Sequence, residues 1–315
     1  MKIVVTGGAG FIGSHIAEYW SNQNAEVHVI DSLRSGFEKN IANFSNVTFH
    51  KGSITNQDLV NSVVENTDYI FHLAALISVP ESLEKPIECL DINVKGLLNV
   101  LDAAKNGGVK KVVHSSSAAI YGDDPRLPKD ISMKPKPQTP YGITKLDGEY
   151  YLQMYYEQYG LPTTSLRYFN VFGPRQDPKS QYAAAIPIFV YKALKNEPIT
   201  IYGDGEQTRD FVYVKDVVAA NVLAATTENV TGVFNVANEK AITINDLAKL
   251  IIKTTNSKSE ILYQPSRPGD IKHSLASIKE TREFLNFNPS HDLTSSLETT
   301  IKYFEGQIRL INLNK

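Results

Sequence analysis

The chain is almost devoid of cysteine, and this absence removes several kinds of site. Cys89 is the single cysteine among 315 residues, so an internal disulfide and any metal or iron–sulfur site held by several thiolates are excluded. No segment approaches the roughly 18 consecutive apolar residues that a membrane helix needs. The start MKIVVTGG also lacks the charged segment, long apolar run and cleavage site of a secretory signal. We therefore expect a cytoplasmic protein without a membrane partner.

An excess of either charge is also missing. The sequence has 32 Lys and Arg residues against 34 Asp and Glu residues, which gives a net charge of −2. The chain has no basic field that would steer it toward nucleic acid, so phosphate binding must be local. A hydrophobic content of 42% is ordinary for a globular protein and excludes a disordered chain. At about 150 residues per domain, the length predicts about two domains.

Short strands alternate with helical patterns in the first half of the chain. Runs rich in β-branched and aromatic residues predict strands at 2–6, 26–30, 47–50, 69–73, 111–116 and 163–168. Amphipathic patterns between them predict helices at 11–22, 57–65, 88–107 and 141–159. This order is typical of an α/β fold, a Rossmann-type doubly wound parallel sheet. Its ligands bind outside the carboxyl ends of the strands.

The pattern changes after residue 170. Prolines at 174, 178, 187 and 198 divide the chain into shorter pieces. The later segments predict helices near 187–196, 215–226, 243–254, 277–285 and 293–305, with brief strands at YVKD and GVFNVA. We predict an NAD-binding domain over 1–170, to which parts of 205–240 return. Residues 171–315 then form, in the main, a smaller C-terminal α/β domain that binds the substrate.

A glycine-rich turn follows the first predicted strand. Gly7, Gly10 and Gly13 lie in TGGAGFIG, where a strand passes into a helix, and such a turn can hold a pyrophosphate. The spacing G-x-x-G-x-x-G also suits a plain strand-to-helix turn. Asp31 at the end of the second strand can accept hydrogen bonds from a ribose diol and would repel a 2′-phosphate. Arg34 can in principle bind that extra phosphate, but the combined pattern favours NAD over NADP.

A second pattern carries acid–base chemistry. Thr139 and Pro140 suit the cap and first position of a helix, which places Tyr141 and Lys145 one turn apart on the same face. The ammonium can favour ionisation of the phenol. Lowering a tyrosine pKa from about 10 to about 7 needs roughly 4 kcal/mol, which a nearby lysine together with the positive nicotinamide ring could supply. Three serines at 115–117 end a strand at the ligand edge and offer a hydroxyl to a substrate alcohol. The Y-x-x-x-K spacing also occurs on ordinary helices. The serines at the ligand edge favour the interpretation of Tyr141 and Lys145 as an acid–base pair.

Motifs along essentially the whole chain resemble the extended short-chain dehydrogenase/reductase family, in particular its nucleotide-sugar 4-epimerases. The matching segments are TGGAGFIG, VIDSLRSG, FHLAALISVPES, INVKGLLNVL, HSSSAAIYG, PYGITK, LRYFNVFGPRQDP, IYGDGEQTRDFVYV and RPGDIKHS. The resemblance implies that Ser117, Tyr141 and Lys145 are the catalytic set. It also implies that Asn93 belongs to an internal polar network and that Tyr168 contacts NAD.

The arguments from residues and from family together predict the binding sites. The predicted NAD site comprises Gly7, Gly10, Phe11, Ile12, Asp31, Arg34, Ser53, Ile54, Leu73, Ala74, Ala75, Asn93, Ser115, Tyr141, Lys145 and Tyr168. Ser53 stands where the family usually has an aspartate near adenine. For a UDP sugar, the resemblance implies Asn170 at the diphosphate, Tyr202 on uracil, and Arg209 and Arg267 at the phosphates. Ser117 also contacts the sugar.

Two further positions bear on the reaction and the sugar. Related dehydratases carry an acidic pair where this chain has Ala118 and Ala119, so return of the hydride, and hence epimerisation, is the expected outcome. Seven positions after Arg267, the family has a residue that limits sugar size, which here is the small Ser274. The resemblance therefore implies interconversion of UDP-GlcNAc and UDP-GalNAc, with UDP-Glc and UDP-Gal as a second activity.

Other readings of the sequence stay open. They are a UDP-glucose 4-epimerase only, a UDP-glucuronate 4-epimerase, a net reductase, dehydratase or decarboxylase on a nucleotide sugar, and a non-catalytic NAD sensor. The family also implies a homodimer that pairs the helices near 93–107 and 141–159. We expect no metal, no nucleic acid and no membrane partner.

Overall fold

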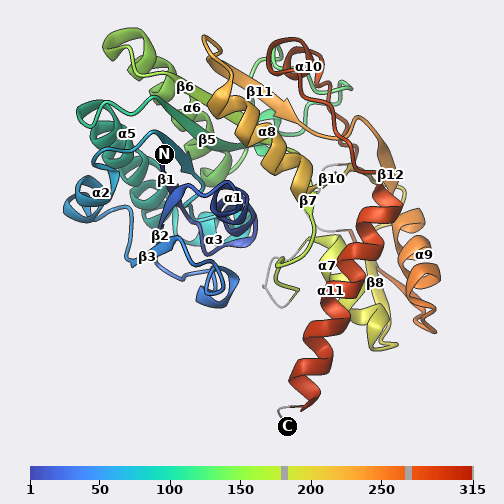
Figure 1. Cartoon of the computed structure of the whole chain (residues 1–315). Coiled ribbons are helices and arrows are strands. Elements are labelled where there is room, and N and C mark those ends of the chain that lie inside the picture. Colours follow the sequence, from blue (N-terminus) through green and yellow to red (C-terminus); the bar gives the residue numbers. More distant parts are fainter. Residues whose placement is uncertain (179–183, 267–271, 314–315) are drawn as a thin grey trace.

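The computed structural model describes residues 1–178, 184–266 and 272–313. A seven-stranded parallel sheet forms its centre, with the strand order β11-β6-β5-β4-β1-β2-β3 (Figure 1). The strands are β1 (Lys2–Thr6), β2 (Glu26–Asp31), β3 (Val47–Lys51), β4 (Tyr69–His72), β5 (Lys111–Ser117), β6 (Thr163–Tyr168) and β11 (Gly232–Val236). All six strands predicted in the first half are confirmed. The order reverses between β1 and β4, the point where doubly wound sheets bind ligands.

Helices cover both faces of this sheet. On one face, α1 (Phe11–Asn22) packs against α8 (Val214–Thr226) over a core that includes Ile16 and Val217. On the other face, α2 (Gln57–Val64), α5 (Gly96–Asn106) and α6 (Pro140–Tyr159) share a second core. Buried strands with apolar residues on both sides, such as Ile3, Val4 and Val5, are what such a three-layer arrangement requires.

The segment after β4 is less regular than predicted. A helix was expected over 88–107, but the structure has α4 (Pro86–Leu90), a π-helical turn at Asp91–Lys95 and then α5. A short helix, α3 (Val79–Glu84), precedes them and was not predicted. Its start is set by Ser78, whose hydroxyl accepts the backbone N–H of Glu81 at 3.1 Å. Local capping of this kind is hard to read from hydrophobic periodicity alone.

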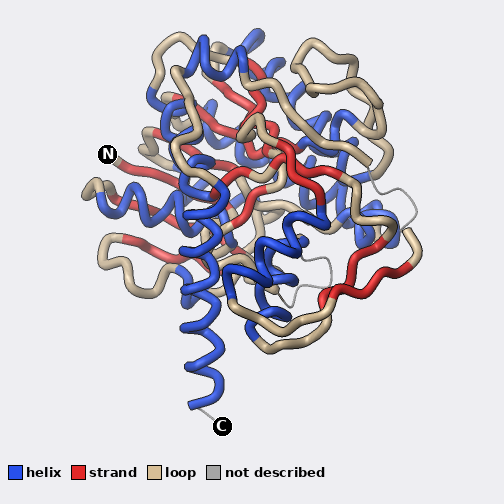
Figure 2. Tube along the Cα trace, turned by 90° about the vertical axis from the view of Figure 1, so that its right-hand side faces the viewer, coloured by secondary structure: helices blue, strands red, loops and turns tan. Residues whose placement is uncertain are grey.

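A smaller group of elements follows β6, with its own apolar core around Phe189, Leu247 and Ile301. Its helices are α7 (Ala185–Leu194), α9 (Ile244–Thr255) and α11 (Leu293–Leu313), while α10 (Lys279–Leu285) packs against β11. Its short strand pairs are β7 (Val171–Phe172) with β10 (Val212–Tyr213), β9 (Thr208–Asp210) with β12 (Ala241–Thr243), and β8 (Ile199–Tyr202) with β13 (Ile261–Gln264). Figure 2 shows α11 extending away from the sheet, so the two chain ends lie far apart.

One predicted strand is wrong. In YVKD only Tyr213 lies in a strand, because α8 begins at Val214. Asp216 stands in the first turn of α8, where a carboxylate is favoured by the helix dipole, and it accepts the backbone N–H of Ser290 at 3.0 Å. The other short strand, GVFNVA, is confirmed as β11, which lies beside β6 in the central sheet.

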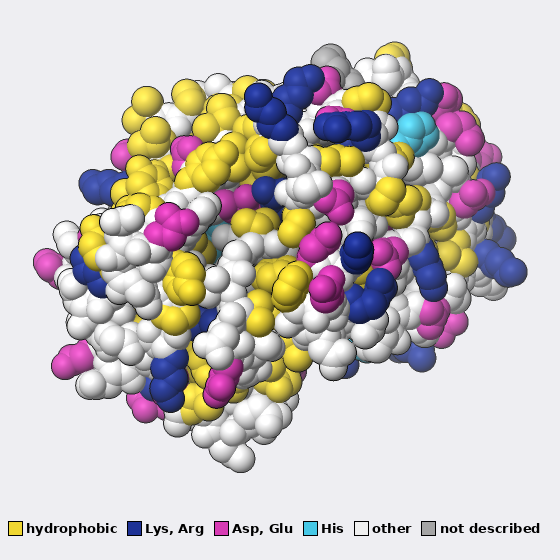
Figure 3. Space-filling model, turned by 90° about the horizontal axis from the view of Figure 1, so that it is seen from above, with side chains coloured by type: hydrophobic (Ala, Val, Ile, Leu, Met, Phe, Trp, Pro, Cys, Tyr) yellow, Lys and Arg dark blue, Asp and Glu magenta, His cyan; other side chains and the backbone are white. Residues whose placement is uncertain are grey.

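The surface carries charges of both signs. On the face shown in Figure 3, basic and acidic side chains are interspersed, and apolar side chains gather on one side. Across the three described ranges, the helices all lack the combination of length and apolar character that crossing a membrane demands.

Candidate active site

A cavity of about 1130 Å³ opens along the carboxyl ends of the central strands. This volume is large enough for a dinucleotide together with a second ligand. The predicted site residues that line it are Gly7, Gly10, Phe11, Ile12, Asp31, Arg34, Ser53, Ile54, Leu73, Ala74, Ala75, Ser115, Ser117, Tyr141, Tyr168, Asn170, Arg209 and Ser274. The fold thus brings together side chains that lie more than 250 positions apart in the sequence.

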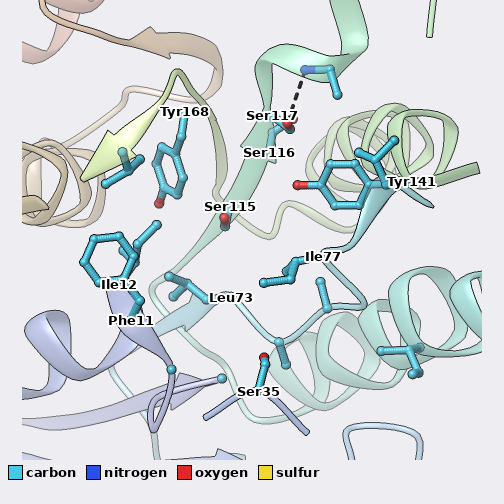
Figure 4. Close-up of a pocket in the computed structure, with 18 of the residues that line it drawn as sticks. Phe11, Ile12, Ser35, Leu73, Ile77, Ser115, Ser116, Ser117, Tyr141 and Tyr168 are labelled. Atoms are coloured by element: carbon cyan, nitrogen blue, oxygen red, sulfur yellow. Dashed lines mark hydrogen bonds between the residues drawn. The ribbon is translucent and has the colours of Figure 1, made fainter. Parts of the chain in front are cut away.

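The glycine-rich turn leaves its end of the cavity open to phosphate. Gly7 has a φ of +70°, a left-handed conformation that suits glycine. The cap residue of α1 is Gly10, which makes no side-chain capping bond, so the first N–H groups of the helix are not taken up by a cap. Phe11 and Ile12, the first residues of α1, lie on the cavity wall (Figure 4). The turn therefore fits the pyrophosphate of a dinucleotide.

Gly13 sets how closely α1 approaches this turn. A Cβ at this position would stand 2.2 Å from the carbonyl oxygen of Gly7. We expect Gly13→Ala to displace the turn and to raise the Kd for NAD at least about tenfold, measured by calorimetric titration. Gly306→Ala is the matched control, because a Cβ there meets nothing within 4 Å. Unchanged NAD affinity in Gly13→Ala would contradict this account of the turn.

Asp31 stands at the end of β2, as predicted, and lines the cavity. Its Oδ1 accepts the backbone N–H of Leu33 at 2.8 Å, and its Oδ2 accepts that of Ala9 at 3.0 Å. Burial raises the pKa of this carboxyl, although the backbone hydrogen bonds oppose the rise. The carboxylate is thus held in one orientation at the edge of the cavity, as an acceptor for a ribose diol.

Arg34 is engaged by carboxylates. Its Nη2 lies 2.7 Å from Glu81 Oε1, and its Nη1 lies 2.6 Å from Glu88 Oε1. These partners hold the pKa of Arg34 above its ordinary value. Because both ends of the guanidinium fork already face carboxylates, Arg34 is poorly placed to bind a 2′-phosphate. This arrangement fits NAD rather than NADP.

The acid–base pair lies at the start of α6, as its sequence predicts. Pro140 is the first residue of the helix, and the Thr139 hydroxyl accepts the backbone N–H of Gly142 at 3.2 Å. Figure 4 shows the Tyr141 hydroxyl pointing into the cavity. Lys145 Nζ lies 5.9 Å from the centre of the Tyr141 ring. The spacing of four residues therefore places both groups on one face of the helix.

Burial shifts the pKa values of both groups of this pair. Burial raises the pKa of Tyr141, and the polar side chain of Ser117 only partly opposes the rise. Burial also lowers the pKa of Lys145, to about 8. The sequence predicts that Lys145 and the positively charged nicotinamide ring together lower the pKa of Tyr141; in the protein by itself, loss of hydration on burial is the larger influence. Ionisation of Tyr141 requires a further positive charge nearby.

Some predicted residues lie off the cavity wall. Lys145 is buried beneath it, and its Nζ donates to the carbonyl oxygen of Ser115 at 2.6 Å. Asn93 is also buried, and it joins the segment after β4 to α6 through bonds to Leu76 and Thr144. It therefore belongs to an internal polar network rather than to the cavity wall.

Two residues predicted to bind UDP are not placed at the cavity. Tyr202 ends β8, is 36% exposed and is absent from the described wall. Its carbonyl oxygen accepts a hydrogen bond from Gln207 Nε2 at 2.8 Å. Arg267 lies outside the described residues. Their roles toward uracil and phosphate remain predictions.

Three separate segments form the end of the cavity nearest β9. Asn170 follows β6, Arg209 lies on β9, and Ser274 reaches the wall from a later segment. The backbone N–H of Ser274 donates to the Thr208 carbonyl at 3.1 Å, which fixes this segment against β9. Ser274 is half-buried, and its neighbour His273 also lines the cavity.

Sequence reasoning missed several residues of the wall. These include Tyr121, Lys129, Gln138 and His273. Tyr121 ends the short 3₁₀ turn at Ala118–Tyr121, directly after the serines, and its closeness to Ser117 is the one signal in the sequence that could have found it. Lys129 reaches the site because its backbone pairs with the segment around Ala276. A contact between such distant segments cannot be predicted from a local sequence pattern.

The model of the NAD dependent epimerase/dehydratase family matches residues 3–237. The chain belongs to this family. It is 37% identical over 309 residues to a putative UDP-glucose 4-epimerase of Methanocaldococcus jannaschii, covering 98% of this chain and 99% of that protein. The enzyme is thus NAD-dependent, as the cofactor site predicts, and the family resemblance is confirmed.

Solved structures of this family superimpose closely on the enzyme. The UDP-N-acetylglucosamine 4-epimerase from Methanobrevibacter ruminantium M1, in complex with UDP-N-acetylmuramic acid, is 44% identical with a TM-score of 0.94, over 97% of this chain and 98% of that one. The UDP-glucose 4-epimerase of Thermotoga maritima, with UDP-glucose, is 38% identical with a TM-score of 0.94, over 98% and 100%. Among relatives are also proteins named as a UDP-N-acetyl-alpha-D-glucosaminuronate decarboxylase and a UDP-glucuronic acid 4-epimerase. Similarity therefore indicates the UDP-sugar 4-epimerase type without selecting the sugar.

Proposed function

We propose that this enzyme interconverts UDP-GlcNAc and UDP-GalNAc by inverting C4, with UDP-Glc and UDP-Gal as a second pair of substrates. The observation that carries the choice of sugar is Ser274, a small residue on the cavity wall near Asn170 and Arg209. A small side chain leaves room for an acetamido group at the 2-position of the sugar. Asn170 and Arg209, on the cavity wall, hold the UDP group, and the family resemblance adds Arg267 and Tyr202 to them.

The chemistry centres on Tyr141 and Ser117. Bound NAD supplies a reversible hydride acceptor for C4 and the positive charge that favours the Tyr141 phenolate. Tyr141 then accepts the proton of the sugar 4-hydroxyl, while Ser117 orients that oxygen, and Lys145 adds its charge from below. Contacts concentrated on UDP let the 4-keto sugar turn over about its bond to the diphosphate. The proton then returns from Tyr141 to the same oxygen, and C4 has the opposite configuration.

The wall near the acid–base pair favours epimerisation over loss of water. Ala118 and Ala119 line the cavity directly after Ser117. Within the described part of the wall, the carboxylates are Asp31, Glu88 and Asp91, and none of them lies on β5, α6 or the turn between them. With no acid there to protonate a leaving hydroxyl, return of the hydride is the available route.

UDP-glucuronate is the second candidate. His273 and Lys129 add two basic side chains to the described wall, and either can attract a sugar carboxylate. A similar protein is named as a UDP-glucuronic acid 4-epimerase, at 30% identity and a TM-score of 0.90.

The test supplies UDP-GlcNAc, UDP-Glc and UDP-glucuronate separately and follows the anomeric proton signals by NMR. We expect UDP-GalNAc to form from UDP-GlcNAc faster than UDP-Gal forms from UDP-Glc. Formation of UDP-Gal without UDP-GalNAc would show that the size argument at Ser274 is wrong. Stoichiometric NADH, or a persistent keto or pentose product, would instead indicate a net redox or decarboxylating enzyme.

Lys145 sets an expected limit to activity at alkaline pH. Its pKa is lowered to about 8 by burial, so the ammonium loses its proton as the pH rises through that value. If the charge assists Tyr141, kcat declines above about pH 8 while the fold remains intact. A profile of kcat from pH 6 to 10, with circular dichroism at each pH, checks this. A kcat that stays level to pH 10 would contradict the role of the charge.

We infer that the enzyme forms a homodimer through α3, α4 and α6. The family resemblance predicts 93–107 as the partner of α6, but within the described residues the exposed large apolar side chains of the helices beside α6 lie on α3 and α4 and not on 93–107. Large apolar side chains on these helices are exposed, with Leu83 at 59%, Ile87 at 72% and Ile143 at 46%. A second copy that covers this face would remove them from water. Light scattering should give twice the 35.0 kDa chain mass, and Ile143→Arg should reduce it to the single-chain value. A wild-type mass of one chain would contradict the dimer.

A further inference from the structure

Glu149 and Arg167 form a buried ion pair beside β5, the strand that ends in the three serines. The mechanism above does not use this pair. Glu149 Oε1 accepts Nε of Arg167 at 2.9 Å, and Glu149 Oε2 accepts Nη2 at 2.7 Å. Both side chains are 4% exposed. A buried carboxylate and guanidinium cost much desolvation, and a buried pair is by itself weak evidence for stability. Its position relative to the reacting groups is therefore the informative feature.

Glu149 continues the line that Tyr141 and Lys145 begin on α6. The three residues are spaced by four, so they share one face of the helix. Two of them bind serines of β5. Lys145 binds the carbonyl oxygen of Ser115 at 2.6 Å, and Glu149 accepts the hydroxyl of Ser116 at 2.6 Å. Two successive residues of β5 are thus tied to α6, directly before Ser117.

The hydroxyls of Ser116 and Ser117 differ in whether their proton is already donated within the protein. Ser116 lines the cavity, but its proton is donated to Glu149. Ser117 Oγ instead accepts the backbone N–H of Ala119 at 3.2 Å (Figure 4). Because the acceptor role is satisfied from Ala119, the proton of Ser117 stays available for Tyr141 or a substrate oxygen. The arrangement at Glu149 therefore leaves Ser117 to act in the cavity.

Arg167 in turn holds Glu149 in one orientation. Its guanidinium lies 4.8 Å from the centre of the Tyr121 ring, and Tyr121 lines the cavity. The Tyr121 hydroxyl donates to Asn235 Oδ1 at 2.7 Å, which joins this group to β11. Five elements therefore meet at the ion pair: α6, β5, β6, β11 and the turn that carries Tyr121. Their contacts fix the orientation in which the Glu149 carboxylate accepts the Ser116 hydroxyl.

We propose that Glu149, oriented by Arg167, is a positioning residue for the reaction. It binds the Ser116 hydroxyl and thereby fixes the end of β5, so that the Ser117 hydroxyl stands in register with Tyr141. This inference rests on the 4-epimerase function proposed above. A misplacement of about 1 Å in a reacting group can cost roughly a hundredfold in rate, so the bond between Ser116 and Glu149 acts on kcat rather than on UDP binding.

Ser116→Ala tests this bond, because it removes the hydroxyl and leaves the ion pair intact. We expect kcat to fall at least about tenfold, with KM for the UDP sugar and the melting temperature little changed. Ser165→Ala is the matched control, since Ser165 is equally buried on the neighbouring strand β6 and should keep kcat within about twofold.

A double-mutant cycle then separates positioning from direct contact of Ser116 with the sugar. The second background is Glu149→Gln with Arg167→Met, which removes both charges and leaves neither unpaired. The proposal predicts that Ser116→Ala has less than about a twofold further effect there, because its partner is already altered.

Several results would overturn the proposal. An equal loss of kcat from Ser116→Ala in both backgrounds, a loss no larger than that in Ser165→Ala, or a loss confined to KM would each do so. If the variant without both charges does not fold, Ser116→Ala alone tests the proposal, which predicts a lower kcat with KM little changed. Failure of the wild-type protein to interconvert any UDP sugar counts against the proposed function instead, so the two failures are distinguishable.

Discussion

Tyr141→Phe should reduce turnover by about a thousandfold, because the substitution removes the atom that we propose accepts the proton of the sugar 4-hydroxyl. The ring and Lys145 remain, and the predicted UDP contacts and most of the predicted NAD contacts lie on other elements, so binding should persist. Initial rates from the NMR assay give the first quantity, and calorimetric titrations with UDP and NAD give the second. The separation matters because a misfolded protein would lose binding and turnover together.

Tyr150→Phe is a matched control for this prediction. Tyr150 lies on the same helix as Tyr141 but is 58% exposed, so loss of its hydroxyl should leave the rate unchanged. If Tyr141→Phe retained more than about a tenth of the wild-type rate, proton transfer would have to occur elsewhere in the cavity.

Ser274→Tyr should discriminate between the two pairs of sugars. A large side chain at this half-buried position on the wall would occupy the space assigned to the acetamido group. Overpacking of this kind costs about 1–3 kcal/mol, so we expect kcat/KM for UDP-GlcNAc to fall on the order of 100-fold. The value for UDP-Glc should change only a few-fold.

Ser274→Ala serves as the small-residue control and should keep both activities. Competition between the two substrates in one NMR tube measures the ratio directly. Equal losses for both sugars in Ser274→Tyr would mean that this residue does not limit the size of the 2-substituent.

Much of the fold is predictable because its signals are local. Each parallel strand is a short apolar run, and the cap and proline at Thr139 and Pro140 identify the start of α6 without any tertiary information. The strand predicted at YVKD is wrong because that prediction also uses local signals alone, and these residues suit a strand in isolation. The α8 helix nevertheless begins at Val214, where Asp216 accepts bonds from a distant segment.

The site is predictable where function depends on spacing along one element. Asp31 at a strand end and Tyr141 with Lys145 on one helix turn are of this kind. Contacts between distant segments are not readable in this way. The pairing of Arg34 with Glu81 and Glu88 joins residues 47 and 54 positions apart, and it bears on the choice between NAD and NADP. The raised pKa of Tyr141 likewise depends on burial, which sequence spacing does not express.

The central claim is that oxidation and reduction at C4 occur within one bound complex and alter only configuration. Epimerisation of a UDP sugar deuterated at C4, run in ordinary water and analysed by NMR and mass spectrometry, tests it most directly. The account predicts that the product of inverted configuration keeps its deuterium at C4, with no label released to solvent. Replacement of that deuterium by solvent hydrogen during inversion would contradict the account.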